Sequence, residues 1–262
     1  MFQDLKLRLR DDGFITTNIP ASKDSVLRTA LQRFLELPLS ERMQYSQKKL
    51  GVAFDGYSYM GQTDSLNQYD KDLLHSFVLS DISTVETFPE TFQEYLKQEF
   101  PEQLAYINAL EKKVLHWLGV SELDLFYDDY IKQMVSCNYY PALALTDQKT
   151  KPLDRLSFHT DVSLFSVFLF GLESGFAYEK SNGKKVLQNA IDEVVLFPGC
   201  FMELMTNGKI KALNHGVILP ENSSEERFSF AFFSIPEPRA SIQHSSFTGS
   251  GKAYYEYYLN KF

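Results

Sequence analysis

The feature of this sequence that most restricts its fold is a series of short β-type segments between residues 134 and 235. The segments are rich in aromatic and β-branched residues, and turn signals such as Asn182-Gly183 and Pro198-Gly199 separate them. An Asn-Gly pair between two such segments is the strongest short hairpin signal. We expect strands over 134–140, 157–170, 175–179, 185–188, 192–197, 210–219 and 227–235. Because no helical pattern separates them, they predict an antiparallel sandwich or barrel.

The first half of the sequence has helical periodicity instead. Apolar residues at helical spacing follow Ser22, a candidate N-cap, and Pro38 ends the pattern. A second apolar stripe runs from Leu104 to Leu118, with Gly119 at the position of a C-terminal cap. We therefore expect a single domain over 1–262. Its predicted parts are a mostly helical region over 1–132, a β core over 133–240 and a C-terminal helix over 241–262.

Composition restricts the kinds of partner. The chain has 262 residues, of which 44% are hydrophobic and 23% charged, as is typical of soluble globular proteins. The net charge of −8 argues against a nucleic-acid partner. No polybasic run or apolar stretch of membrane-spanning length is present, so we expect no membrane partner. The two cysteines and the absence of an apolar leader predict a cytoplasmic protein.

Three residues of the β region carry metal-binding chemistry. His159 and Asp161 are two residues apart in a predicted strand, so period-2 alternation would place both side chains on one face. His215 follows in a later strand. Two imidazoles and one carboxylate are the ligand set that holds non-haem Fe(II) and leaves coordination positions open. A His-x-Asp pair alone is weak, because it arises by chance in roughly a quarter of chains of this composition. In that case His159 would be a core histidine and Asp161 a turn cap.

Four further polar residues lie on predicted strand faces. Alternation places Arg227 and Ser229 on one face of the last strand, while phenylalanines fill the other face. It likewise places Asn138 and Tyr140 on one face of their strand. A buried guanidinium without an anion is costly, so Arg227 needs a partner. That partner would be either an acidic side chain or the carboxylate of a ligand.

In their order and spacing these residues resemble the isopenicillin-N-synthase-like superfamily of 2-oxoglutarate- and Fe(II)-dependent dioxygenases. The resemblance covers most of the chain and is marked at the following places: Asp12-Gly13-Phe14-Ile15, Leu37-Pro38-Leu39-Ser40-Glu41-Arg42, Gly56-Tyr57, Asn138-Tyr139-Tyr140-Pro141, His159-Thr160-Asp161, Met205-Thr206-Asn207-Gly208, His215, Arg227-Phe228-Ser229, Phe232-Phe233 and Pro236. It implies a mainly β fold, in which a double-stranded β-helix (a jelly roll) is wrapped by N-terminal α-helices.

The resemblance also implies roles for the candidate residues. His159, Asp161 and His215 would be the iron ligands and the catalytic centre. Arg227 and Ser229 would hold the distal carboxylate of the cosubstrate 2-oxoglutarate, assisted by Tyr140 and Asn138. The enzyme would use O2 to hydroxylate, desaturate or cyclise a small molecule and would release succinate and CO2.

The chain departs from the family pattern at four places, one of which is the Ala142-Leu143-Ala144 run after Pro141, where relatives commonly carry a Pro- or Lys-Cys run. The strand that usually precedes the first helix is missing, so we expect the edge of the barrel to be covered differently. Gly216 stands where relatives usually carry Arg, and Cys200 stands where an Asp is usual.

Two other functions remain open on the sequence. The Arg-x-Ser pair also occurs in superfamily members that bind iron without 2-oxoglutarate, as isopenicillin N synthase does. The chain could therefore be such an oxidase. It could also be a non-enzymatic jelly-roll binding protein, although the complete His/Asp/His set argues against a decayed site. The sequence indicates neither the substrate nor the oligomeric state.

Overall fold

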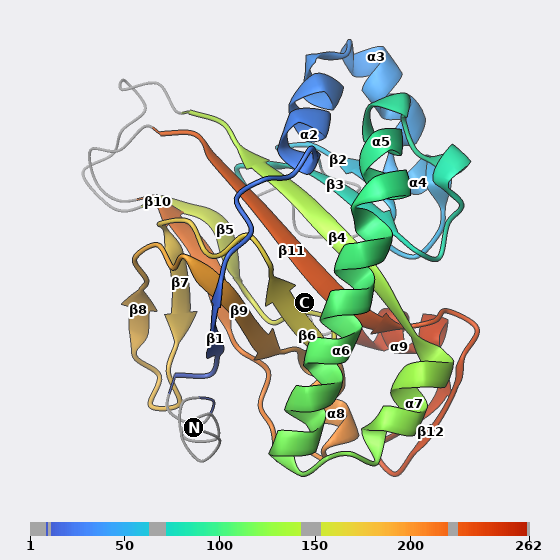
Figure 1. Cartoon of the computed structure of the whole chain (residues 1–262), viewed down its shortest axis with the longest axis vertical. Coiled ribbons are helices and arrows are strands. Elements are labelled where there is room, and N and C mark those ends of the chain that lie inside the picture. The colour runs from blue at the N-terminus through green and yellow to red at the C-terminus, as the bar shows by residue number, and fades with distance from the viewer. Residues whose placement is uncertain (1–8, 10–11, 63–71, 143–152, 220–224, 261–262) are drawn as a thin grey trace.

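Two antiparallel sheets face each other in the computed structural model of the chain, which describes residues 9, 12–62, 72–142, 153–219 and 225–260 (Figure 1). The larger sheet contains, from edge to edge, β1 (Ile15–Pro20), β9 (Glu193–Pro198), β6 (Phe165–Phe168), β11 (Arg227–Pro236), β4 (Ile131–Tyr140), β3 (His75–Ser80) and β2 (Gly56–Ser58). The smaller sheet contains β5 (Leu153–His159), β10 (His215–Leu219), β7 (Phe176–Glu179) and β8 (Lys185–Leu187). The arrangement confirms the predicted antiparallel jelly roll.

Helices cover the outer face of the larger sheet (Figure 1). Three of these helices are α2 (Leu27–Glu36), α5 (Glu90–Gln98) and α6 (Phe100–Leu118). The other helical elements of the described chain are α3 (Leu39–Arg42), η1 (Met43–Tyr45), α4 (Gln47–Leu50), η2 (Val85–Thr87), α7 (Leu123–Tyr130), α8 (Cys200–Met205) and α9 (Gly251–Leu259). As predicted, α6 ends at Gly119, whose φ of +75° is a left-handed conformation that glycine adopts without strain. No helix in the described part of the chain is both long and apolar enough to cross a membrane.

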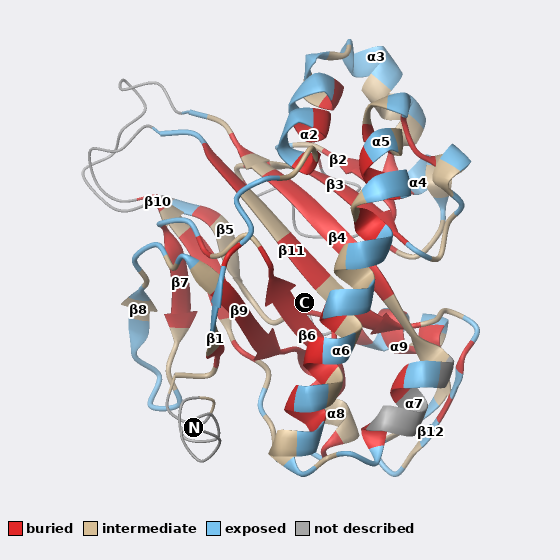
Figure 2. Cartoon of the chain, viewed as in Figure 1, coloured by how far each residue is buried: buried red, intermediate tan, exposed pale blue. Residues whose placement is uncertain are grey.

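Buried hydrophobic residues form one cluster on the helix side of the larger sheet and another between the two sheets. Figure 2 shows buried residues along the strands of the larger sheet and on the helices beside it. On the helix side, the ring of Phe77 from β3 lies 4.7 Å from that of Phe34 in α2 and 4.8 Å from that of Phe92 in α5, measured between centroids. Between the two sheets, Phe168, Phe176 and Phe197 pack together with Tyr178 and Ala231. Such aromatic packing stabilises the molecule beyond the burial of area alone.

Three predictions about local structure were wrong. The strand before the first helix is present, because β1 pairs with β9. Ser22 does not cap α2, since the helix begins at Leu27, whose backbone N–H donates to the hydroxyl of Ser25. The C-terminal segment is more than a helix, because a hairpin of β12 (Ser241–His244) and β13 (Phe247–Ser250) precedes α9.

The most important correction concerns the segment that contains His159. The expected continuous strand over 157–170 is two strands in different sheets: β5 ends at His159 in the smaller sheet, and β6 begins at Phe165 in the larger one. Asp161 therefore lies in the connection between the sheets, so alternation along one strand does not determine the direction of its side chain. The Asn182-Gly183 hairpin prediction is confirmed, because β7 and β8 pair in register across it.

Candidate functional site

The structure brings His159, Asp161 and His215 together between the two sheets. His159 is the last residue of β5 and lies opposite His215, the first residue of β10, in the ladder between these strands. The connection after β5 then turns Asp161 back toward both rings. One ligand atom from each of the three residues lies within 4.8 Å of the others. They form the only such group of three or more metal-ligating side chains in the part of the chain that the structure describes.

Hydrogen bonds orient both imidazoles in the same way. His159 Nδ1 lies 2.8 Å from the carbonyl oxygen of Ser157, and His215 Nδ1 lies 3.1 Å from that of Leu213. Because a carbonyl can only accept, each Nδ1 carries the proton in these bonds. Each Nε2 then has a free lone pair, and the two Nε2 atoms lie 3.4 and 3.7 Å from the Asp161 carboxylate. Such outer hydrogen bonds typically hold metal-ligating histidines in place.

The Asp161 side chain and backbone are held by separate partners. Ser166 of β6 donates its hydroxyl hydrogen to Asp161 Oδ2 at 2.5 Å. The backbone carbonyl of Asp161 accepts the N–H of Cys200 at 2.7 Å. The preceding Gly199 is required here, because a Cβ at that position would lie 2.4 Å from the carbonyl oxygen of Ser163. The start of α8 therefore packs directly against the connection that carries the carboxylate.

The C-terminal helix α9 supports the same connection from another side. Tyr254 donates to the carbonyl of Val162, and Tyr258 donates to that of Thr160, each at 2.7 Å. These two carbonyls flank Asp161 in the sequence. The position of the carboxylate thus depends on a helix almost a hundred residues away in the chain.

The electrostatics of the triad differ among its members: against the opposing effect of burial, the Asp161 carboxylate raises the pKa of His159. Burial lowers the pKa of His215 to about 4, so this imidazole is neutral at neutral pH. Burial alone would raise the pKa of Asp161, but the neighbouring imidazoles and the Ser166 hydrogen bond lower it below its usual value. A neutral imidazole and an ionised carboxylate are the forms that ligate metals.

The predicted carboxylate-binding residues lie on two neighbouring strands of the larger sheet. Arg227 is opposite Tyr140, and Ser229 is opposite Asn138, in the ladder between β11 and β4. Arg227 is only 6% exposed, and its Nε donates to the carbonyl of Ser174 at 3.0 Å. Its Nη1 is buried and has no hydrogen-bond partner. The acidic partner considered as the alternative is absent among the described residues, so this buried N–H group can donate to a ligand.

Two serines orient the amide of Asn138, a feature that the sequence analysis missed. Ser136 donates its hydroxyl hydrogen to Asn138 Oδ1 at 3.0 Å. Ser76 of β3 lies 3.1 Å from Ser136 and must therefore be the donor in their contact. This chain of bonds fixes Oδ1 toward the serines and leaves the amide nitrogen directed elsewhere. The Ser-Cys-Asn-Tyr-Tyr pattern of β4 could have indicated Ser136, which alternates with Asn138.

Tyr140 connects this group to the triad. Its ring packs with Val217, which lies two residues after His215 on β10.

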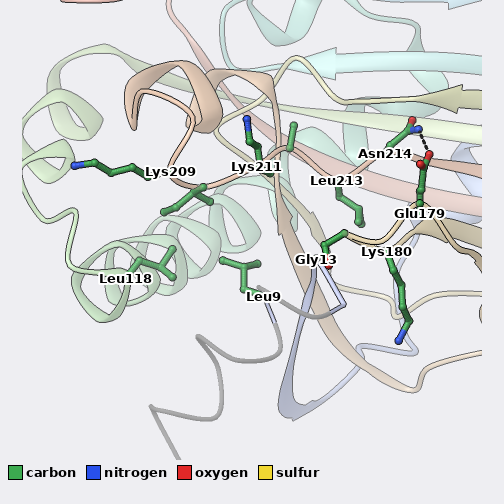
Figure 3. Close-up of a pocket in the computed structure, with 13 residues that line it drawn as sticks. Leu9, Gly13, Leu118, Glu179, Lys180, Lys209, Lys211, Leu213 and Asn214 are labelled. Carbon is green, nitrogen blue, oxygen red and sulfur yellow. Dashed lines mark hydrogen bonds between the residues drawn. The ribbon is translucent and has the colours of Figure 1, made fainter.

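A separate pocket of about 750 Å³ lies beside the segment that leads into β10 (Figure 3). Its lining includes Leu9, Leu118 and the three lysines 180, 209 and 211, and none of the seven predicted site residues. Lys180 pairs with Asp12 at 2.7 Å, and Lys211 pairs with Glu203 at 3.0 Å. These two lysine charges therefore already have acidic partners.

Comparison with known proteins finds a family that the β core resembles. The model of the 2OG-Fe(II) oxygenase superfamily matches residues 131–236, which is the segment from the start of β4 to the end of β11. The matched segment contains all seven candidate site residues. Feruloyl CoA ortho-hydroxylase 2 of Arabidopsis thaliana is 29% identical over 82% of this chain and 60% of its own length. Leucoanthocyanidin dioxygenase of Malus domestica is 25% identical over 80% of this chain and 60% of its own.

The chain thus spans about three fifths of the length of these two curated relatives. Among solved structures, a full-length Neurospora crassa protein in complex with alpha-KG and 5-formyluracil has a TM-score of 0.72 at 18% identity. The match covers 99% of this chain and 89% of that one. JOX2 in complex with 2OG, Fe and JA has a TM-score of 0.75 at 18% identity, over 98% of this chain and 81% of that one. These likenesses show the shared jelly-roll fold.

Proposed function

We propose that the protein is an Fe(II)- and 2-oxoglutarate-dependent oxygenase that hydroxylates, desaturates or cyclises a small molecule. The observation that carries this proposal is the pairing of two features inside one barrel. A buried His/Asp/His cluster suits a cation, and a buried guanidinium with an unpaired N–H suits an anion. The match of residues 131–236 to the 2OG-Fe(II) oxygenase model supports the same conclusion.

The triad fits a divalent iron ion by its donor set. Both Nε2 lone pairs and the Asp161 carboxylate converge on one point, while the Nδ1 positions are already used by backbone carbonyls. Two imidazoles and one carboxylate leave open positions on the metal. We assign His159, Asp161 and His215 as its ligands. When bound, the metal would supply the O2 chemistry, and the protein would supply position and a dry cavity.

We assign the distal carboxylate of 2-oxoglutarate to Arg227 and Ser229. The unpaired Nη1 of Arg227 would donate one charge-assisted hydrogen bond, and the hydroxyl of Ser229 would donate another. Tyr140 lies directly beside Arg227 in the ladder and would border the carbon chain of the cosubstrate. The amide nitrogen of Asn138, fixed by the two serines, would donate to a cosubstrate oxygen.

The proposed primary substrate is a small molecule, with O2 as the second reactant. Feruloyl CoA, 5-formyluracil and JA, named with the relatives and neighbours, differ widely in chemistry, so they support this class and no single compound. The net charge of −8 disfavours nucleic acid as a partner. Both cysteines are free and buried, which supports the proposed cytoplasmic location.

The proposal predicts that O2 uptake depends strictly on 2-oxoglutarate. Oxygen consumption by the Fe(II)-loaded protein would be followed with and without the cosubstrate, and succinate would be measured at the end. We expect one succinate for each O2 consumed, including slow uncoupled turnover without a primary substrate. Uptake that proceeds equally well without 2-oxoglutarate would favour the 2-oxoglutarate-independent oxidase, and iron binding without any uptake would favour a binding protein.

A further inference from the structure

Arg155 of β5 is a second buried guanidinium beside the proposed carboxylate pocket. Arg155 is only 2% exposed and is one of the largest fully buried side chains in the described part of the protein. Its Cζ lies 5.3 Å from the centroid of the Tyr140 ring, and the Cζ of Arg227 lies 5.1 Å from the same centroid. The two guanidinium groups therefore share one tyrosine ring as a neighbour.

In the described part of the chain, the hydrogen bonds of Arg155 go to neutral groups and give its charge no counter-ion. Its Nη1 donates to the backbone carbonyl of Glu225 at 2.9 Å, and its Nη2 donates to that of Pro141. Both acceptors are neutral carbonyls, beside the start of β11 and the end of β4. Its Nε is buried and has no partner. Within the described residues, neither Arg155 nor Arg227 forms an ion pair with a carboxylate.

Two buried positive charges without a counter-ion are unfavourable unless an anion joins them. A guanidinium cannot shed its proton in a protein, so burial cannot be relieved by neutralisation. Burial and the nearby charge of Arg227 both lower the pKa of Arg155, which shows that the two groups repel each other. A neutral side chain could donate to the two carbonyls at lower desolvation cost. The charge of Arg155 therefore calls for a role beyond those hydrogen bonds.

We propose that Arg155 supplies a second positive charge to the carboxylate pocket, so that the pocket selects 2-oxo acids whose far end is a carboxylate. This inference rests on the proposed function and adds a residue to it. Arg227 provides the direct hydrogen bond, and Arg155 acts across the Tyr140 ring through its field, which is strong because the surroundings are dry. Arg155 is a positioning residue, and its effect falls on the distal end of the cosubstrate only.

The test compares two ligands that differ only at that end. Calorimetry under anaerobic conditions would measure the affinity of the Fe(II)-loaded protein for 2-oxoglutarate and for 2-oxopentanoate, which chelates identically but ends in a methyl group. For the wild type we expect a strong preference for 2-oxoglutarate. In Arg155→Met that preference should fall about tenfold, a typical effect of removing one charge at this range in a protein interior. The affinity for 2-oxopentanoate should stay unchanged.

Two further variants separate charge from structure. Arg155→Lys keeps the positive charge and should retain most of the preference for 2-oxoglutarate. Arg155→Gln keeps a hydrogen-bond donor but no charge, and the preference should be lost. This pair decides the question if Arg155→Met fails to fold. The matched control is Arg239→Met, which removes a positive charge from a side chain that is 92% exposed and should change nothing.

Three results would overturn the inference in distinguishable ways. A wild-type preference that persists in folded Arg155→Met or Arg155→Gln would show that Arg155 acts only on structure. An equal loss of affinity for both ligands would lead to the same conclusion. A wild type that binds neither 2-oxo acid would contradict the proposed function itself, and with it the inference that rests on it.

Discussion

At the triad, one buried carboxylate lies between two imidazoles, whereas in the carboxylate pocket two buried guanidinium groups lie beside one tyrosine ring. The protein holds the triad side chains by its own hydrogen bonds, through Ser166 and the carbonyls of Ser157 and Leu213. In the pocket, each guanidinium instead keeps a buried N–H that has no hydrogen-bond partner among the described residues. This difference supports the proposed assignment of the first region to a cation and of the second to an anion.

A third region shows how the molecule buries a charge-bearing group when no ligand is involved. Glu111 of α6 is fully buried, and its Oε2 accepts the hydroxyl hydrogen of Tyr127 at 2.8 Å. Burial raises the pKa of this carboxyl to about 8, so it is mostly protonated at neutral pH. A carboxyl can be buried in this neutral form, but a guanidinium cannot. Buried arginines therefore indicate an anion more strongly than a buried acid indicates a cation.

The largest expected effect comes from removing the carboxylate of the triad. Asp161→Ala should abolish iron binding and turnover while the fold remains, because the Thr160 and Val162 carbonyls stay bonded to α9. Iron content and thermal unfolding of the variant would be measured together. Asp128→Ala, in a side chain that is 62% exposed, is the control. Undiminished activity in Asp161→Ala would contradict the assignment of the triad.

The next effect concerns Glu111 and the pH dependence of stability. The folded pKa of about 8 lies above the usual 4.5, so the folded state holds its proton while the unfolded chain loses it. Stability should therefore fall as pH rises from about 4.5 to about 8, by about 2 kcal/mol between pH 5 and pH 7.

Glu111→Gln should remove this part of the pH dependence and raise stability at neutral pH. Urea unfolding at several pH values would test it against Glu102→Gln, an exposed position on the same helix. If Glu111→Gln and the wild type lose stability in parallel, the carboxyl is not neutral in the folded state, and the contrast with the arginines fails.

A smaller effect is expected when a hydrogen bond to the carboxylate of the triad is removed. Ser166→Ala removes the hydrogen bond to Asp161 Oδ2 and should weaken metal affinity about tenfold, the lower end of the usual effect of such partners. Ser80→Ala is a matched control, because Ser80 is also buried and donates to a carboxylate, Asp55, away from the triad. Competition with a chromophoric chelator would measure both affinities. Equal affinity in the two variants would mean that the triad is not preorganised by Ser166.

The sequence predicted most strands of the β core and named the seven residues of the candidate site, because alternation and turn signals are local properties. Asn138, Tyr140, Arg227 and Ser229 lie on ordinary paired strands, and there alternation gave the correct neighbours. Alternation failed for Asp161, because the chain leaves β5 at His159 and crosses to the other sheet. The three triad residues do come together, although the reason given for their geometry was wrong.

Arg155 was missed for a related physical reason. The register between β5 and β10 shifts twice within a few residues, so alternation from His159 does not indicate the face on which Arg155 lies. Ser166 and the tyrosines of α9 were missed because their contacts with the Asp161 connection are tertiary, and no local pattern encodes them. The short helix α8 follows the Pro198-Gly199 turn signal and was not predicted, since its six residues are too few to give a periodic signal.

The most direct test of the central contrast is an anaerobic titration of the Fe(II)-loaded protein with 2-oxoglutarate, in the wild type and in Arg227→Ala. Chelation of the iron by 2-oxoglutarate gives a weak visible charge-transfer band, which reports binding at the metal. The midpoint of the titration also depends on how the protein binds the distal carboxylate of 2-oxoglutarate. We expect a band in both proteins, with a midpoint about a hundredfold higher in Arg227→Ala, the loss typical of a charge-assisted hydrogen bond in a buried site. A wild type that binds iron but shows no band, or a midpoint unchanged by Arg227→Ala, would contradict the account.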